Sequence, residues 1–196
     1  MENIKKTLEN WLNELNHFSF KNYEELPDIE LYMDQVVTYL EKQLQIFQTS
    51  SLDKQITSSM INNYVKGNVV SAPISKKYNK EHLAMIEEIC TLKQVLTIAE
   101  VKQIISQRYN TVEKAEVFNS FNAMNNEKID AAISEAFKHL NDIDDNDKDQ
   151  LINLALDFAL TANCYINISK RILFLTRIYD EIQKAKEKEK KDKNEE

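Results

Sequence analysis

The stretch that decides the fold is residues 56–105, ITSSMINNYVKGNVVSAPISKKYNKEHLAMIEEICTLKQVLTIAEVKQII. The charge balance of its first half is unusual, because residues 54–80 contain five lysines and no Asp or Glu, whereas the whole chain carries a net charge of −7. A basic segment on an acidic chain is typical of an anion-binding surface. Nucleic acid is therefore the first candidate partner.

The same stretch predicts a short helix followed by a small β-hairpin. Thr57 is a suitable N-cap for a helix that runs to about residue 65. Gly67, the single glycine of the chain, follows where a left-handed C-terminal residue is expected. Residues 69–70 and 77–78 have strand character, with a proline-containing turn between them. We expect these two strands to pair and to form a wing that is basic at its tip.

Apolar residues at helical spacing predict further helices on both sides of this wing. The predicted ranges are 3–18, 28–47, 80–94 with Asn79 as N-cap, 98–107 with Thr97 as N-cap, 127–140, and about 147 to beyond 182. Residues 110–126 are interpreted as a short helix or a linker. Trp11 is expected to anchor the first of these helices, and Ile29 to face inward from the second. One Gly and two Pro in 196 residues favour helices over a β-rich fold, so the predicted fold class is all-α with a small β-hairpin.

The last helix has the apolar spacing of a coiled coil. From Leu151 to Ile182 its apolar positions advance by a mean of about 3.4 residues, close to the ~3.5 of a left-handed coiled coil. This spacing predicts a homodimer formed through the last helix. The residues assigned to the dimer interface are Phe158, Tyr165, Ile172, Leu175, Tyr179 and Ile182.

Several short segments resemble, in order and spacing, the DNA-binding domain of MerR-type regulators. The matching segments are INNYVKGNVV, KKYNKEHLAMI and LTIAEVKQII. The nearer resemblance is to a family of uncharacterised bacterial proteins that share this MerR-like domain and the preceding helix, here LPDIELYMDQVVTYLEKQL. The resemblance covers roughly residues 26–108. This chain departs from the pattern at Ser59 and Asn62, where MerR-type proteins usually carry arginines.

The resemblance implies a winged helix-turn-helix domain joined to a helical dimerisation domain that ends in a long helix. The expected division of the chain is an N-terminal helix over residues 1–25, a MerR-like winged helix-turn-helix domain over 26–109, a helical C-terminal domain over 110–190 and a solvated tail over 191–196. In this arrangement the short helix near residues 57–65 is the recognition helix, and the hairpin that follows it is the wing.

The expected function is sequence-specific binding of double-stranded DNA by a homodimeric transcriptional regulator. Ser58, Ser59, Asn62 and Asn63 are assigned to base edges or phosphates, since Asn pairs well with adenine and Ser accepts either contact. Lys66, Lys76, Lys77 and Lys80 are assigned to the phosphate backbone, and Tyr78 either braces the wing or bonds a phosphate. The alternative is a protein–protein interaction module that reuses a MerR-like fold without binding DNA. The sequence leaves open whether an effector ligand exists.

The sequence does not indicate an enzyme, a metal site or a cofactor. Its three histidines have no Cys or acidic partner at ligand spacing on one helix face. The acidic turn that starts at Asp142 lacks the Gly and the final Glu of an EF-hand loop. No Gly-rich phosphate loop and no Ser/His/Asp or Cys/His arrangement is apparent. We therefore expect no catalytic residues and no cofactor.

The remaining composition indicates a cytoplasmic protein. The N-terminal stretch is polar and amphipathic and lacks the apolar core of a signal peptide. No window offers the ~18 charge-free apolar residues of a membrane span, so no membrane association is expected. Cys90 and Cys164 lie far apart inside helical patterns and are interpreted as buried free thiols.

Overall fold

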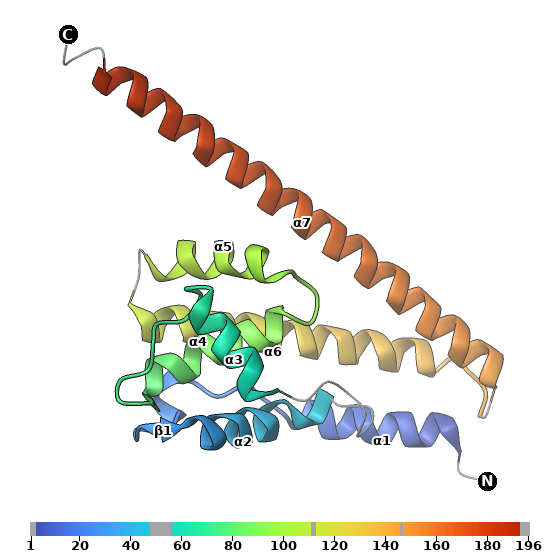
Figure 1. The fold of residues 1–196 in the computed structure, drawn as a ribbon. Helices are drawn as coiled ribbons and strands as arrows, with labels where there is room; N and C mark the ends of the chain where they lie inside the picture. Colours follow the sequence, from blue (N-terminus) through green and yellow to red (C-terminus); the bar gives the residue numbers. More distant parts are fainter. Residues whose placement is uncertain (1–2, 48–55, 111–112, 146, 193–196) are drawn as a thin grey trace.

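The computed structural model describes residues 3–47, 56–110, 113–145 and 147–192, and of residues 188–192 it describes the backbone alone. The elements in chain order are α1 (Ile4–Asn16), η1 (Tyr23–Glu25), β1 (Leu31–Tyr32), α2 (Met33–Leu44), η2 (Gln45–Phe47), α3 (Ser58–Lys66), β2 (Lys77–Tyr78), α4 (Lys80–Leu92), α5 (Ile98–Tyr109), α6 (Lys114–Leu140) and α7 (Lys148–Asp192). The chain is mainly α-helical with a small antiparallel two-stranded sheet (Figure 1). The all-α prediction is therefore confirmed.

The three N-caps that the sequence predicts are present. Thr57 Oγ1 accepts a hydrogen bond from the N–H of the third residue of α3 at 3.2 Å, and Asn79 Oδ1 accepts one from α4 at 3.1 Å. Thr97 forms a reciprocal capping box with Glu100, whose carboxylate accepts the Thr97 N–H at 2.8 Å. These bonds satisfy backbone N–H groups at the helix starts, which have no carbonyl partner within the helix.

Three hydrophobic clusters hold the helices together, and the smallest joins Phe118 of α6 to Ala84 of α4 and Leu26. The main core lies among α2, α3, α4, α5 and the sheet, and its fully buried members include Leu40, Ile61, Leu83 and Val101. The second core lies among α1, α6 and the start of α7, around Leu12, Leu15, Ile133 and Leu140. Because α3 packs on the main core alone, its outer face is left free.

The wing does not form by the strand pairing that the sequence predicts. Strand β2 pairs with β1, in the register Leu31 with Tyr78 and Tyr32 with Lys77, and not with residues 69–70. The N–H groups of Val69 and Val70 both donate to Tyr64 O, at 2.9 and 3.4 Å, because the chain turns back onto the end of α3. These two valines are buried as core residues instead of forming a strand.

Three local predictions near this sheet are also wrong. The second helix begins at Met33, not near residue 28, because residues 31–32 are taken into β1, and Ile29 is 67% exposed. Gly67 is not left-handed, with a φ of −76°. Asn68 takes the left-handed conformation in its place, with a φ of 53°, which asparagine tolerates better than most residues. Gly67 still permits a close approach, since a Cβ there would lie 3.2 Å from Asn63 O.

Residues 110–126 and 127–140 were expected as separate segments, but residues 114–140 form the single helix α6. Its first half looks polar in the sequence because inward-facing asparagines hold an extended segment of the chain. Tyr23 N–H donates to the side chain of Asn119 at 2.6 Å, and the side chain of Asn122 donates to Lys21 O at 2.7 Å. A polar residue with a backbone partner is buried at little cost.

Helix α7 starts beside α1 and α6 and then crosses over α5, and its C-terminal end projects from the body (Figure 1). Near its start, Leu151, Leu154 and Phe158 pack on the second core. Further along, the side chain of Gln103 on α5 donates to Leu173 O at 2.9 Å. Cys90 is buried, as expected, but Cys164 lies exposed on α7, which corrects that prediction. A solvated tail was expected over residues 191–196. Residues 191–192 belong to the end of α7, and residues 193–196 lie outside the described residues.

Candidate nucleic-acid interface

The outer face of α3 gathers the residues expected to read bases. Ser58, Ser59, Asn62, Asn63 and Lys66 are all exposed, and at ~100° per residue they fall within one side of the helix. Among the described residues, none of these side chains has a hydrogen-bond or ion-pair partner. The face therefore carries free donors and acceptors and no carboxylate.

The inner face of α3 fixes the helix on the main core. Ile61 is fully buried and Tyr64 is 4% exposed. Burial raises the pKa of the Tyr64 hydroxyl to about 12. At the C-terminal end, Lys102 of α5 donates from Nζ to Gly67 O at 2.7 Å. A lysine at a helix C-terminus also suits the helix dipole.

Lys102 was not indicated by the sequence as a DNA-binding residue. It is exposed and lies at the end of α3 that carries Lys66, so it adds a second positive charge there. The two lysines are 36 positions apart, and no local pattern could have linked them. The contact between α5 and Gly67 that brings them together exists only in the folded chain.

The tip of the wing is a tight turn over residues 74–77. Ile74 and Lys77 form a two-way backbone bridge, at 3.1 and 2.9 Å. Ser75 and Lys76 between them have φ values of 50° and 65°, as in a hairpin turn with two left-handed residues. The turn exposes Ile74 and Lys76 at the tip.

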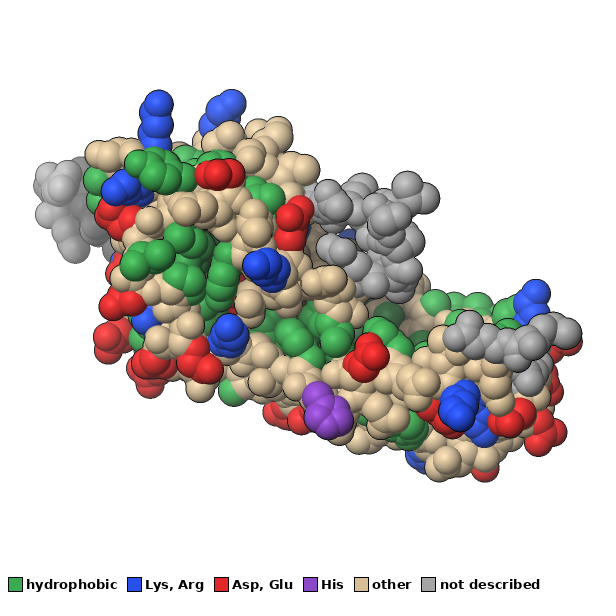
Figure 2. Space-filling model, turned by 90° about the horizontal axis from the view of Figure 1, so that it is seen from below, with side chains coloured by type: hydrophobic (Ala, Val, Ile, Leu, Met, Phe, Trp, Pro, Cys, Tyr) green, Lys and Arg blue, Asp and Glu red, His purple; other side chains and the backbone are tan. Residues whose placement is uncertain are grey.

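Lys77 and Lys80 point toward acidic and aromatic residues from the start of the chain. Lys77 Nζ lies 3.6 Å from a carboxylate oxygen of Glu30 and 5.7 Å from the centre of the Tyr32 ring. Lys80 Nζ donates to Glu24 O at 3.1 Å. On the face seen in Figure 2, acidic side chains gather at the left-hand end, where β1 and α2 begin. The fold thus brings acids close to part of the basic segment. Lys54 lies outside the described residues.

Tyr78 is 2% exposed, and its ring packs edge-on against His82 with centroids 5.6 Å apart. Burial raises the pKa of its hydroxyl. Of the two roles expected for Tyr78, its position favours bracing the wing over bonding a phosphate.

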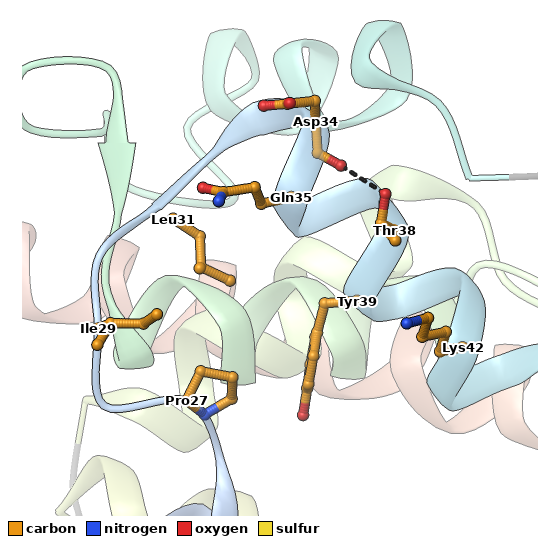
Figure 3. A pocket seen from close by; sticks show the side chains of 8 residues that line it. All are labelled: Pro27, Ile29, Leu31, Asp34, Gln35, Thr38, Tyr39 and Lys42. Atoms are coloured by element: carbon orange, nitrogen blue, oxygen red, sulfur yellow. Dashed lines mark hydrogen bonds between the residues drawn. The ribbon is translucent and has the colours of Figure 1, made fainter.

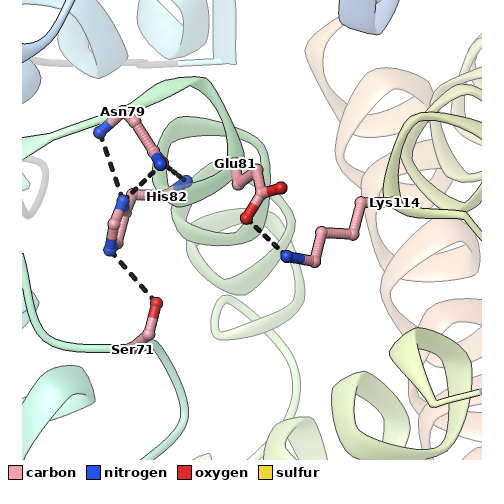
Figure 4. Close-up of polar contacts among 5 residues, drawn as sticks. All are labelled: Ser71, Asn79, Glu81, His82 and Lys114. Atoms are coloured by element: carbon pink, nitrogen blue, oxygen red, sulfur yellow. Dashed lines mark hydrogen bonds and ion pairs between the residues drawn. The ribbon is translucent and has the colours of Figure 1, made fainter.

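A polar cluster fastens the first part of the wing to α4 (Figure 4). Ser71 Oγ lies 3.1 Å from His82 Nε2, and His82 Nδ1 lies 2.5 Å from Asn79 Oδ1. Burial lowers the pKa of His82, so the ring is held neutral. The sequence did not indicate this serine–histidine–asparagine row. Because Asn79 also caps α4, the arrangement works as a structural clamp on residue 71.

A hollow of about 350 Å³ between residues 27–31 and the outer side of α2 is shown in Figure 3. Pro27, Tyr39, Asp34 and Lys42 are among the residues that line it. None of the predicted DNA-binding residues lines this hollow. It is separate from the α3 face. In the part of the chain that the structure describes, no group of three His, Cys, Asp or Glu side chains is arranged to hold a metal ion.

The residues assigned to dimerisation are mostly exposed on α7. Phe158 is half-buried in the second core, whereas Tyr165, Ile172, Leu175, Tyr179 and Ile182 are between 47% and 69% exposed. Among the described helices, α7 is the one that is long and apolar enough to cross a membrane by length and composition alone. Leu154 and Phe158 at one end of this segment, and Leu173 at the other, pack on the same body. A membrane span would break one of these two attachments.

Comparison with known proteins places the chain in a family without assigning an activity. No curated protein and no solved structure matches it. The model of one family, described as a domain of unknown function (DUF1836), matches residues 21–154. This range includes the α3 face, the wing and the start of α7. The resemblance to MerR-type regulators remains an expectation from the sequence. Because the match spans more than half of the chain, the protein belongs to the DUF1836 family.

Proposed function

We propose that this protein is a MerR-like winged helix-turn-helix protein that binds double-stranded DNA in a sequence-specific manner and regulates transcription as a cytoplasmic homodimer. The observation that carries the proposal is the outer face of α3. An exposed helix face of Ser, Asn and Lys, on a helix fixed by a buried inner face, suits insertion into the major groove.

The charges near α3 support the same proposal. Lys66 and Lys102 lie at one end of the helix, and Lys76 is exposed at the wing tip. These three side chains have no carboxylate partner among the described residues. We assign them to phosphates, whereas Lys77, which is paired with the Glu30 carboxylate, contributes less.

The exposed stripe on α7 supports the homodimer. Tyr165, Ile168, Ile172, Leu175, Tyr179 and Ile182 follow one another at steps of three and four residues. Each of these six side chains is between 47% and 69% exposed, so the stripe is an apolar surface that a second copy can bury. Packing against a second copy covers this surface without breaking the contacts of α7 with the body.

A salt titration on one duplex tests the phosphate contacts. Each neutralised phosphate contributes about −0.9 to the slope of log affinity against log salt. The double variant Lys66→Gln with Lys76→Gln should therefore bind with a slope shallower by about two for each bound subunit. Lys6→Gln with Lys138→Gln is the matched control, since both lysines are exposed elsewhere and the net charge changes equally. Equal slopes in the two double variants would contradict the assignment.

A selection from random duplexes tests sequence reading. If Asn62 makes a bidentate adenine contact, Asn62→Ala should lose about 1–3 kcal/mol on the selected site and little on unrelated DNA. Equal losses on both would mean that Asn62 positions the helix without reading a base.

A protein–protein interaction module is the second candidate. The ion pair between Lys77 and Glu30 favours it, because it reduces the free positive charge near the wing. This candidate predicts no duplex binding even at ~50 mM salt, where electrostatic association is strong. Such a result would replace the DNA-binding proposal.

A further inference from the structure

A cavity of about 480 Å³ lies between α1, α6 and the start of α7, and none of the predicted DNA-binding residues lines it. Its walls are apolar and come from separate segments of the chain. The lining side chains include Leu8 and Trp11 of α1, Phe47 of η2, Ile129 of α6, and Leu154 and Phe158 of α7. The volume is typical of a small-molecule site, for which the range is roughly 300–1,000 Å³.

Two small residues, one on each of two helices, line this cavity. Ala132 of α6 and Ala155 of α7 both line it and both are exposed. The indole N–H of Trp11 donates to Ile46 O at 3.4 Å, so the rest of the ring offers only apolar surface. Water gains few hydrogen bonds against such walls, which favours an apolar occupant.

One charged side chain, Lys128, lines the cavity, and none of the described lining residues is a carboxylate. Lys128 Nζ lies 2.9 Å from Glu127 Oε1, but both side chains are about two-thirds exposed. An exposed pair of this kind contributes little free energy, so the ammonium group is available to another anion. An apolar body with a single anionic end matches this arrangement.

We propose that this cavity binds an amphipathic carboxylate, such as a medium-chain fatty acid, with its chain among α1, α6 and α7 and its carboxylate at Lys128. This site does not depend on the DNA-binding proposal. Its position is suited to an effector, because α6 continues from the cavity to the main core and α7 continues to the exposed stripe.

The single tryptophan of the chain makes the proposal directly testable, because Trp11 lines the cavity. A terminally brominated medium-chain fatty acid should quench its fluorescence saturably, with one molecule bound per chain. Ala132→Leu fills the cavity and should weaken binding by about tenfold or more. Ala131→Leu is the matched control, since Ala131 is exposed on the same helix and does not line the cavity, and it should bind as wild type.

A second pair of variants provides an independent test in case Ala132→Leu does not fold. Ala155→Leu should also weaken binding, and its exposed neighbour on α7, Ala159→Leu, should not. Lys128→Gln should weaken the carboxylate several-fold and leave the matched brominated alcohol unchanged. Circular dichroism of all variants establishes that they are folded.

Three outcomes would overturn the proposal. Quenching that rises linearly without saturation would show partitioning onto exposed apolar surface. Equal affinities for Ala132→Leu and Ala131→Leu would place the ligand elsewhere. Quenching that weakens as the protein concentration rises would assign the cavity to contacts between copies of the chain. These fluorescence results have the same meaning whether or not the protein binds DNA.

Discussion

The buried acid pair on α4 predicts that the fold is weakened as the pH rises. Glu87 and Glu88 are 1% and 0% exposed. Burial raises the pKa of each carboxyl to about 7 from its ordinary 4.5, and Asn122 and the hydroxyl of Tyr109 offset only part of this effect. Tyr109 donates to Glu88 Oε1 at 3.0 Å, but Oε2 of each glutamate has no partner among the described residues.

The direction of the effect follows from linkage. Because the folded-state pKa lies above the unfolded one, the neutral carboxyls stabilise the fold. This contribution is complete below about pH 4.5 and is lost as the pH rises through about 7. The gap between the two pKa values corresponds to about 3 kcal/mol for each glutamate. That is a large fraction of the ~5–15 kcal/mol stability of an ordinary domain.

Urea unfolding at about pH 5 and about pH 8 measures this loss. Glu87→Gln and Glu88→Gln keep the shape of the neutral side chain and cannot ionise. Each should match wild type near pH 5 and exceed it by up to about 3 kcal/mol near pH 8. Burial lowers the pKa of His82, but that group affects all variants alike and cancels in the comparison.

Glu116→Gln is the matched control, because Glu116 is an exposed glutamate on α6. Its stability should follow wild type at both pH values. The reasoning is refuted if wild type is equally stable at both, or if the Glu87 and Glu88 variants lose stability in parallel with it.

Three further predictions concern assembly and local stability. Ile172→Asp with Leu175→Asp should give a folded monomer in sedimentation where wild type gives a dimer, since both residues are at least half exposed; a wild-type monomer at micromolar concentration would remove the α7 interface. Thr97→Ala should lower the free energy of unfolding by about 1 kcal/mol through loss of the α5 cap, and an unchanged urea midpoint would contradict it. Tyr109→Phe removes the donor to Glu88 and should cost about 1–3 kcal/mol, more at pH 8 than at pH 5, and equal losses at the two pH values would show that Glu88 stays neutral.

Local signals in the sequence predicted the local structure well. Thr57, Asn79 and Thr97 each cap the helix that follows, because an N-cap depends on residues at most three positions away. The polar side of α3 also follows from local spacing, since Ile61 and Tyr64 alone decide which side is buried. The helix and its exposed side were therefore predictable without knowledge of the fold.

Contacts between distant segments could not be predicted in this way. The pairing of β1 with β2 joins residues 31–32 to residues 77–78, and it also brings Glu30 to Lys77. The basic segment is free of acids along the sequence but not in space. The polar first half of α6 was misjudged for the same reason, because its asparagines bind backbone groups of residues 20–23 that lie about a hundred positions earlier.

The proposed ligand site and the proposed DNA-binding face are joined through two packed helices, α6 and α4, and their coupling can be measured. Helix α6 lines the cavity at Ile129 and packs on α4 at Phe118, and α4 shares the main core with α3. If a carboxylate changes the affinity for DNA by some factor, DNA must change the affinity for the carboxylate by the same factor. Titrating Trp11 fluorescence with the brominated fatty acid, with and without saturating duplex, gives one factor, and titrating duplex with and without the acid gives the other. If the fold-change in the affinity for DNA differs from the fold-change in the affinity for the fatty acid, the two titrations do not report on the same binding equilibrium. If neither affinity changes, the two sites are independent.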